Sequence, residues 1–230
     1  MTNKTNKMEE LGLVACDVVR TEFEKALAGR PVTTRFLEYS LHSTPNLMSG
    51  RIMEALGEFK AQGIRKVLLG YGLCSNGVVG VASEGGLVMP RCHDCIAMLL
   101  GSPKRYFEIF RKNPGTYFLT EGWIRNRGDP LSSVEYKYTP RMGEKKALRG
   151  MSLELANYKT FCFVNNGVGD REAVRERTKE NCKVFKKEYL ELESGIDYFA
   201  NLLDGPHPEE DFLVLPAGER VQNDYFYQII

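Results

Sequence analysis

The sequence has 230 residues, of which 43% are hydrophobic and 27% charged, and its formal net charge is +1. This near-neutral balance excludes a global field that would recruit nucleic acid or an anionic membrane, so we expect neither partner. No apolar run approaches the ~20 residues of a membrane helix, and the first residues lack the long apolar region of a signal peptide. We therefore expect a cytoplasmic protein whose six cysteines stay reduced. The composition does not indicate an oligomeric state.

Short apolar runs alternate with amphipathic stretches along the chain. The predicted strands lie at residues 11–16, 33–41, 64–69, 87–90, 115–120, 159–164 and 211–215. The predicted helices lie at residues 17–28, 45–62, 96–100, 104–112, 171–187 and 196–203, with a further short helix after Ser75. This alternation predicts an α/β fold with a doubly wound, largely parallel sheet of the Rossmann or flavodoxin type.

One basic segment, residues 125–150, has no clear hydrophobic period and contains two prolines. It fits a lid, an interaction segment or a linker. We therefore expect an α/β lobe in residues 1–124, a lid or linker in 125–150, and a second α/β portion in 151–230 that completes or faces the first.

Potential metal ligands follow four successive predicted strands. The first strand ends at Cys16 and the second at His42, while Cys74 follows the third and the segment Cys92–Cys95 follows the fourth. Ligands of doubly wound sheets bind outside the carboxyl ends of the strands. Because these ends share one edge of a parallel sheet, we expect the side chains to converge there.

Cys74, His93 and Cys95 form the predicted metal site. His93 and Cys95 are two residues apart, so both side chains would leave an extended segment on the same side. Two cysteines and one histidine are the protein ligands of a catalytic zinc that keeps one position open. Asp94 would then act as a general base or would orient a ligand. The expected pocket has further residues on its wall and near its mouth: Cys16, His42 and Trp123.

Other interpretations fit parts of this pattern. Cys162 and Cys182 are small core residues, His42 could cap the next helix, and Trp123 could serve packing alone. Backbone amides of the turn after the third strand could cradle a phosphate or carboxylate. The residues of this possible cofactor-binding turn are Gly70, Gly72, Ser75 and Asn76. No Walker lysine and no GxGxxG spacing accompany it, so the sequence does not indicate a nucleotide site.

Six stretches of the sequence carry a family resemblance: VACDVVRTEF, LHSTPNL, LLGYGLCSNGVVG, MPRCHDCIAMLLGS, GTYFLTEGW and DFLVLPAG. Together they resemble the domain of unknown function 1638 family of anaerobic bacteria and archaea. The resemblance implies a context of corrinoid-dependent methyl transfer in anaerobic one-carbon metabolism. It implies no activity for the chain itself.

Two functions follow as expectations. The first is a metal-dependent transferase in which zinc activates a thiol or water for one-carbon transfer, with a small-molecule or corrinoid ligand. The second is an accessory protein that binds a metal, an iron–sulfur cluster or a corrinoid and delivers it to a methyltransferase partner.

Overall fold

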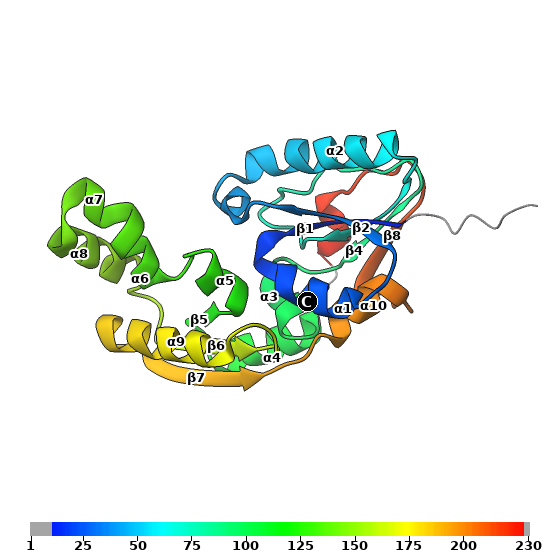
Figure 1. The fold of residues 1–230 in the computed structure, drawn as a ribbon. Helices are drawn as coiled ribbons and strands as arrows, with labels where there is room; N and C mark the ends of the chain where they lie inside the picture. The colour runs from blue at the N-terminus through cyan, green and yellow to red at the C-terminus, as the bar shows by residue number, and fades with distance from the viewer. Residues whose placement is uncertain (1–10, 228–230) are drawn as a thin grey trace, which may run out of the picture.

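Five strands form the larger sheet, in the order β2-β1-β3-β4-β8 (Figure 1). The computed structural model describes residues 11–227. Neighbouring strands of this sheet run parallel, except that β8 is antiparallel to β4. The strands are β1 (Leu11–Cys16), β2 (Val32–Leu37), β3 (Lys66–Gly70), β4 (Leu87–Pro90) and β8 (Phe212–Leu215).

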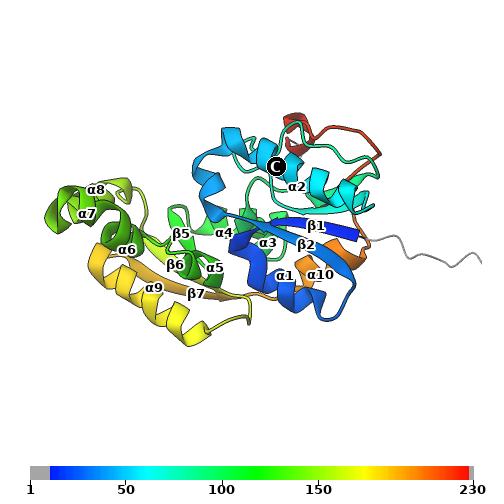
Figure 2. The same ribbon diagram turned by 45° about the horizontal axis from the view of Figure 1, so that its top comes forward.

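Helices cover both faces of this sheet, because its central strands are apolar on both sides. In β1, Leu13 and Ala15 face one core and Val14 faces the other. The helix α2 (Pro45–Ala61) covers one face, and α1 (Arg20–Leu27) and α10 (Asp197–Asp204) cover the opposite face (Figures 1 and 2). The predicted doubly wound, largely parallel α/β fold is therefore confirmed.

The strand order creates a crevice between the ends of β1 and β3. The chain passes from β1 outward to β2 and then crosses to β3 on the other side of β1. The connection that leaves β1 leads outward to β2, whereas the connection that leaves β3 leads the opposite way to β4, so the two diverge at the carboxyl ends of β1 and β3. Such a topological switch point is where ligands bind in open α/β sheets.

A smaller sheet holds three parallel strands, β5 (Thr116–Leu119), β6 (Thr160–Asn165) and β7 (Glu188–Glu193). Phe161 of β6 packs in a core with α8 (Glu144–Glu154) and α9 (Arg171–Phe185), while Cys162 packs in the core shared with the larger sheet. We call the two sheets with their helices the larger and the smaller lobe. Residues 1–124 thus supply β5 to the smaller lobe, and residues 151–230 supply β8 to the larger one.

Two short helices, α3 (Cys95–Leu99) and α4 (Pro103–Lys112), connect β4 to the smaller lobe. Their apolar side chains join the core beneath the larger sheet. Among the helices of residues 11–227, none has the length and apolar character needed to cross a membrane.

The basic segment 125–150 is helical throughout much of its length and packs on the smaller sheet. It begins at the last residue of α5 (Glu121–Arg125), contains α6 (Pro130–Ser132), the π-helix η3 (Ser133–Tyr138) and α7 (Thr139–Met142), and ends within α8. Leu131 and Val134 are buried in the core of the smaller lobe. The π-helix and the short helices explain why the sequence shows no regular 3.6-residue period.

Two local predictions were wrong. The second strand ends at Leu37, not at His42, because its partner β1 ends at the paired residue Cys16. His42 lies instead in the 3-10 helix η2 (Tyr39–Ser43). The expected helix after Ser75 is a series of turns, because residues 74–76 have positive φ angles that a right-handed helix excludes.

Candidate functional site

Three cysteines line one small cavity at the switch point. Cys16 ends β1, Cys74 follows β3, and Cys95 is the first residue of α3, the next element after β4. The cavity has a volume of 30 Å³ and is almost entirely apolar. Gly70 and Tyr71, at the end of β3, complete its inner side. We call it the cysteine cavity.

The turns that carry Cys74 and Cys95 are joined by backbone hydrogen bonds. The Leu73 amide donates to the Cys92 carbonyl at 2.8 Å, and the Cys74 amide donates to the His93 carbonyl at 2.9 Å. Gly72 makes this approach possible, because a Cβ atom there would lie 2.8 Å from the Cys92 carbonyl oxygen. Gly72 therefore has a packing role, and its role in cofactor binding stays a prediction.

The backbone of the turn that carries Cys74 is strained. Cys74, Ser75 and Asn76 have φ angles of 46°, 56° and 66°, in the left-handed region that non-glycine residues rarely adopt. Such strain gathers at functional sites. The side chains of Ser75 and Asn76 are exposed and line neither the cysteine cavity nor the cleft described below, whereas Gly70 lines the cavity.

His93 packs against the helix α4. Its ring lies edge-on to Phe107 of α4, with 6.4 Å between ring centroids, and it does not line the cysteine cavity. The reason is that α3 begins at Cys95, so the two-residue alternation of an extended segment stops at Asp94. Cys16, predicted on the wall, takes the place beside Cys74 and Cys95.

Asp94 caps the helix that begins at Cys95. Its carboxylate accepts a hydrogen bond of 2.9 Å from the Ile96 amide, as an N-cap aspartate does. Burial raises the pKa of Asp94, although the bonded amides of Ile96 and Ala97 and the nearby His93 oppose the rise. Asp94 lines the cleft and not the cysteine cavity, but its charge raises the pKa of Cys74 and Cys95, so its carboxylate lies near these thiols.

Burial also raises the pKa of the three thiols of the cysteine cavity. It raises the pKa of Cys16 to about 11 and that of Cys74 to about 12, and it holds the pKa of Cys95 well above the usual value. Charge on Cys16 raises the pKa of Cys74, and charge on both raises that of Cys95, so the sulfurs are near neighbours. All three are thiols at neutral pH until a cation compensates the charge.

Two buried polar atoms at this cavity lack hydrogen-bond partners among residues 11–227. They are the hydroxyl oxygen of Tyr71 and the indole nitrogen of Trp123. The Tyr71 hydroxyl is near enough to Cys16 to lower the pKa of that thiol, yet it finds no oxygen or nitrogen partner. Unsatisfied buried groups of this kind mark a place for a bound water, ion or ligand.

The side chains of this site do not form a metal site as they stand. Within residues 11–227, no three cysteine, histidine, aspartate or glutamate side chains are arranged so that they could hold a metal ion. The cysteine sulfurs must therefore turn toward a common point before they can bind one.

Three aromatic residues separate the cysteine cavity from a larger cleft. Tyr39, His42 and Trp123 line both hollows, and we call them the aromatic wall. The Nδ1 of His42 donates to the Tyr39 carbonyl at 2.7 Å, so Nε2 accepts from the Ser43 hydroxyl at 3.2 Å. The rings of His42 and Trp123 meet edge to face with 5.0 Å between centroids.

Trp123 is held in place from both lobes. The Thr120 hydroxyl caps α5 at the Trp123 amide, and Arg125 of the same helix forms a 2.6 Å ion pair with Asp17. Gly122 lets α5 approach η1 (Asp17–Val19), because a Cβ atom there would lie 1.7 Å from the Val18 carbonyl oxygen. Trp123 is thus fixed where it lines both the cysteine cavity and the cleft.

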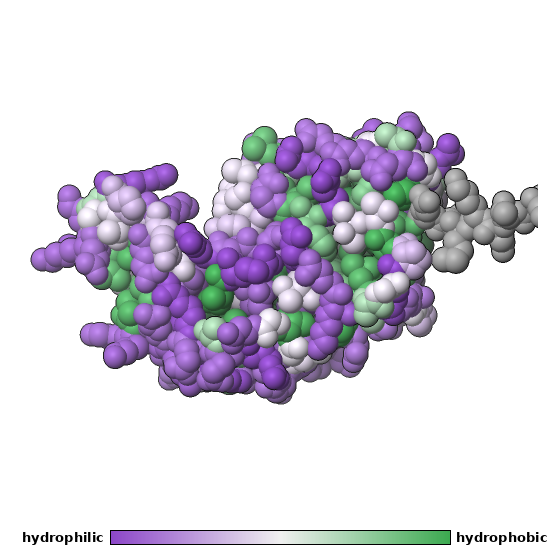
Figure 3. Space-filling view, in the orientation of Figure 1, coloured by the Kyte–Doolittle hydropathy of each residue, from purple (hydrophilic) through white to green (hydrophobic). Residues whose placement is uncertain are grey.

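The cleft lies between the two lobes, where the space-filling view shows the molecule hollowed (Figure 3). It consists of two adjoining hollows of 540 and 660 Å³. The residues shared by both hollows are Tyr117, Trp123, Glu154 and Tyr158. We call this space the interlobe cleft.

Comparison with known proteins places the chain in a family. The family model described as "Protein of unknown function (DUF1638)" matches residues 36–203, which is most of the chain. The chain belongs to the DUF1638 family. The resemblance inferred from the six sequence stretches is therefore confirmed. Searches of curated proteins and of solved structures found no match.

The region that matches the DUF1638 family holds Cys74, Cys95 and the aromatic wall but begins after Cys16. It also holds the cleft residues that sequence reasoning missed, among them Tyr117, Arg127 and Lys137. The close spacing of Tyr136, Lys137 and Tyr138 was the available signal, but only the packing of the two lobes shows that these residues face Tyr39 and His42.

Proposed function

We propose that this chain binds a soft metal ion, most favourably zinc, through Cys16, Cys74 and Cys95. We further propose that the bound metal serves methyl or other one-carbon transfer. The observation that carries the proposal is the convergence of three thiols, from the ends of three neighbouring strands, on one cavity at the switch point.

The donor set and the size of the cavity suit a single ion. Thiolates are preferred ligands of zinc, and three protein ligands leave a position for a substrate. The cavity is small, with a volume of 30 Å³ against 540 and 660 Å³ for the two hollows of the cleft, which favours a single ion over an iron–sulfur cluster. Metal binding would displace the thiol protons that burial now retains.

When bound, the metal would lower the pKa of a thiol or water and so supply a nucleophile near neutral pH. In a methyl transfer, the methyl group leaves its corrinoid donor, and the electron pair of the broken bond stays on the donor. The thiol sulfur supplies the pair for the new carbon–sulfur bond, and the thiol proton is released. The aromatic wall excludes water from this step, and the unpaired Tyr71 hydroxyl can orient the attacking group.

Metal analysis of protein purified without oxygen tests this proposal. We expect about one equivalent of zinc per chain, and a loss of most of it in the C16S, C74S and C95S variants. The matched controls are C162S and C182S, because both of these cysteines are buried away from the cavity. Absence of a transition metal from the wild type, or equal metal content in all five variants, would refute the site.

A second candidate is an accessory protein that carries the metal or a corrinoid to a methyltransferase. The aromatic wall between the cysteine cavity and the cleft favours this second function, because a carrier needs no open position for substrate. The two functions differ in an assay of thiol methylation by methylcobalamin. Zinc-loaded protein that methylates a small thiol supports the transferase, whereas loaded protein without this activity supports the carrier.

The cellular location is also part of the proposal. All six cysteines, which lie within the described part of the chain, are unpaired. Reduced thiols suit the cytoplasm, and we assign the protein there.

A further inference from the structure

The interlobe cleft concentrates aromatic side chains. Five of the 11 tyrosines and the single tryptophan line its 540 Å³ hollow, and they come from both lobes. They are Tyr39, Tyr117, Trp123, Tyr136, Tyr138 and Tyr158. Rings of this kind stack on conjugated ligands through offset and edge-to-face contacts. The volume is that of a pocket for a small molecule or cofactor.

Two cations of the cleft make no ion pair within residues 11–227. The Arg127 guanidinium lies 4.3 Å from the centre of the Tyr136 ring, and the Lys137 amino group lies 5.2 Å from that of Tyr138. By contrast, Arg177 on α9 pairs with three carboxylates. Glu154 is the acidic residue that lines the 540 Å³ hollow, so this hollow retains a net positive charge, while Asp94 lines the adjoining hollow. The 540 Å³ hollow is therefore suited to an anionic group.

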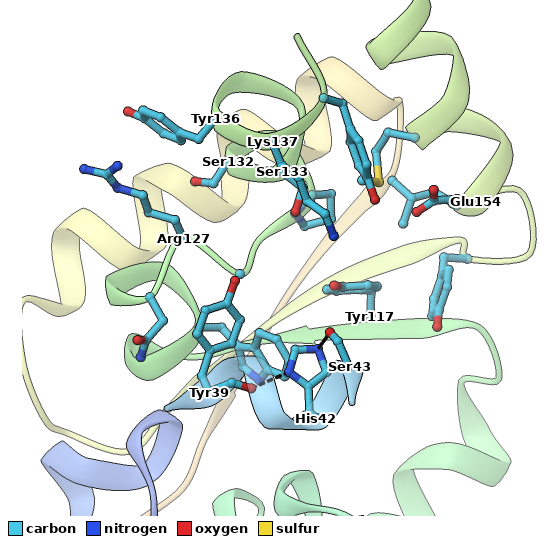
Figure 4. A pocket seen from close by; sticks show the side chains of 18 residues that line it. Tyr39, His42, Ser43, Tyr117, Arg127, Ser132, Ser133, Tyr136, Lys137 and Glu154 are labelled. Carbon is cyan, nitrogen blue, oxygen red and sulfur yellow. Dashed lines mark hydrogen bonds between the residues drawn. The ribbon is translucent and has the colours of Figure 1, made fainter. Parts of the chain in front are cut away.

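The backbone that places these cations is unusual. Lys137 and Tyr136 belong to the π-helix η3, and Arg127 has a φ angle of 55°. Residues of the π-helix face the hollow, and Lys137 points into it (Figure 4). Single-turn π-helices and left-handed non-glycine residues recur at functional sites.

We propose that the interlobe cleft binds a planar, conjugated small molecule that carries a phosphate or carboxylate group. The ring would lie among the tyrosines and Trp123, and Lys137 would bind the anionic group. This inference deepens the proposed function, because the cleft adjoins the cysteine cavity through the aromatic wall. Binding in the cleft needs no bound metal, so this proposal and the proposed metal site can fail separately.

Fluorescence of the single tryptophan provides the test, because Trp123 lines the cleft. Metal-free protein is titrated with two matched pairs of probes, flavin mononucleotide with riboflavin and AMP with adenosine. We expect saturable quenching by at least one phosphorylated probe. It should bind about 10-fold more tightly than its uncharged partner, because a charge-assisted contact is lost in the latter.

The Lys137→Gln variant should remove most of this preference for the phosphorylated probe and leave binding of the uncharged partner unchanged. Lys183→Ala is the control, because Lys183 is exposed on α9 and does not line the cleft. Circular dichroism establishes that the variants are folded. The proposal is overturned if neither phosphate-bearing probe saturates below ~1 mM. Equal affinity within both pairs, or a preference that survives in Lys137→Gln, overturns it as well.

Discussion

Glu22 is a buried carboxyl group without a hydrogen-bond partner in the described part of the chain. It is on α1, its relative exposure is 0%, and neither carboxyl oxygen is bonded. Burial raises its pKa from an ordinary 4.5 to about 7. The charge of Glu121 adds to the rise, and Arg125 and the Glu22 amide oppose it. Both charged neighbours lie on α5, the helix that carries Trp123.

This pKa sets the sign and size of a pH effect on folding. Between pH 4.5 and 7 the folded protein keeps the Glu22 proton, whereas the unfolded chain has lost it. The free energy of unfolding therefore falls as the pH rises through this range. The change from 4.5 to about 7 corresponds to about 3 kcal/mol, most of it lost between pH 5 and pH 8.

Urea unfolding at pH 5, 6, 7 and 8 measures this effect in the wild type and in the Glu22→Gln variant. The buried amide of glutamine costs stability at every pH, but that cost does not depend on pH. The stability of wild type relative to Glu22→Gln should thus decline by about 2 to 3 kcal/mol from pH 5 to pH 8. Glu24→Gln, at an exposed position of α1, is the control. Parallel curves for wild type and Glu22→Gln would refute the reasoning.

Two further predictions concern α5 and the aromatic wall. Gly122→Ala should destabilise the fold by at least ~2 kcal/mol in urea unfolding, because the added Cβ meets the Val18 carbonyl oxygen at 1.7 Å. Gly150→Ala, in an open helical position, should instead gain up to ~1 kcal/mol, and similar effects of the two changes would contradict this account. Trp123→Ala should open the cysteine cavity and speed the reaction of Cys74 with Ellman's reagent several-fold. An unchanged rate would show that Trp123 does not shield the thiols.

The sequence predicted the central strands because their pattern is strong and local. Short apolar runs between turn formers marked β1, β3 and β4, and strand adjacency followed from the α/β alternation. The strand β7 was missed. Three of its six residues, Glu188–Glu193, are glutamates, and it lies at the edge of the smaller sheet with only β6 beside it. Such an edge strand lacks the continuous apolar run of a central one.

The candidate site was predictable where it depends on strand ends. Cys16, Cys74 and Cys95 meet because the ends of β1, β3 and β4 share one edge. His93 could not be placed, because its direction depends on the first residue of α3, and helix ends are poorly marked in sequence. The sequence could not predict the interlobe cleft. The cleft forms only when the two lobes pack together, and their strands are interleaved along the chain.

Titration with cobalt(II) under anaerobic conditions tests the central claim most directly. Cobalt occupies zinc sites and shows a charge-transfer absorption when thiolates bind it. We expect this absorption to saturate at about one equivalent in the wild type and in His93→Ala, and to be lost or strongly reduced in C16S, C74S and C95S. Absence of the absorption in the wild type, or its persistence in all three cysteine variants, would contradict a metal site at the switch point.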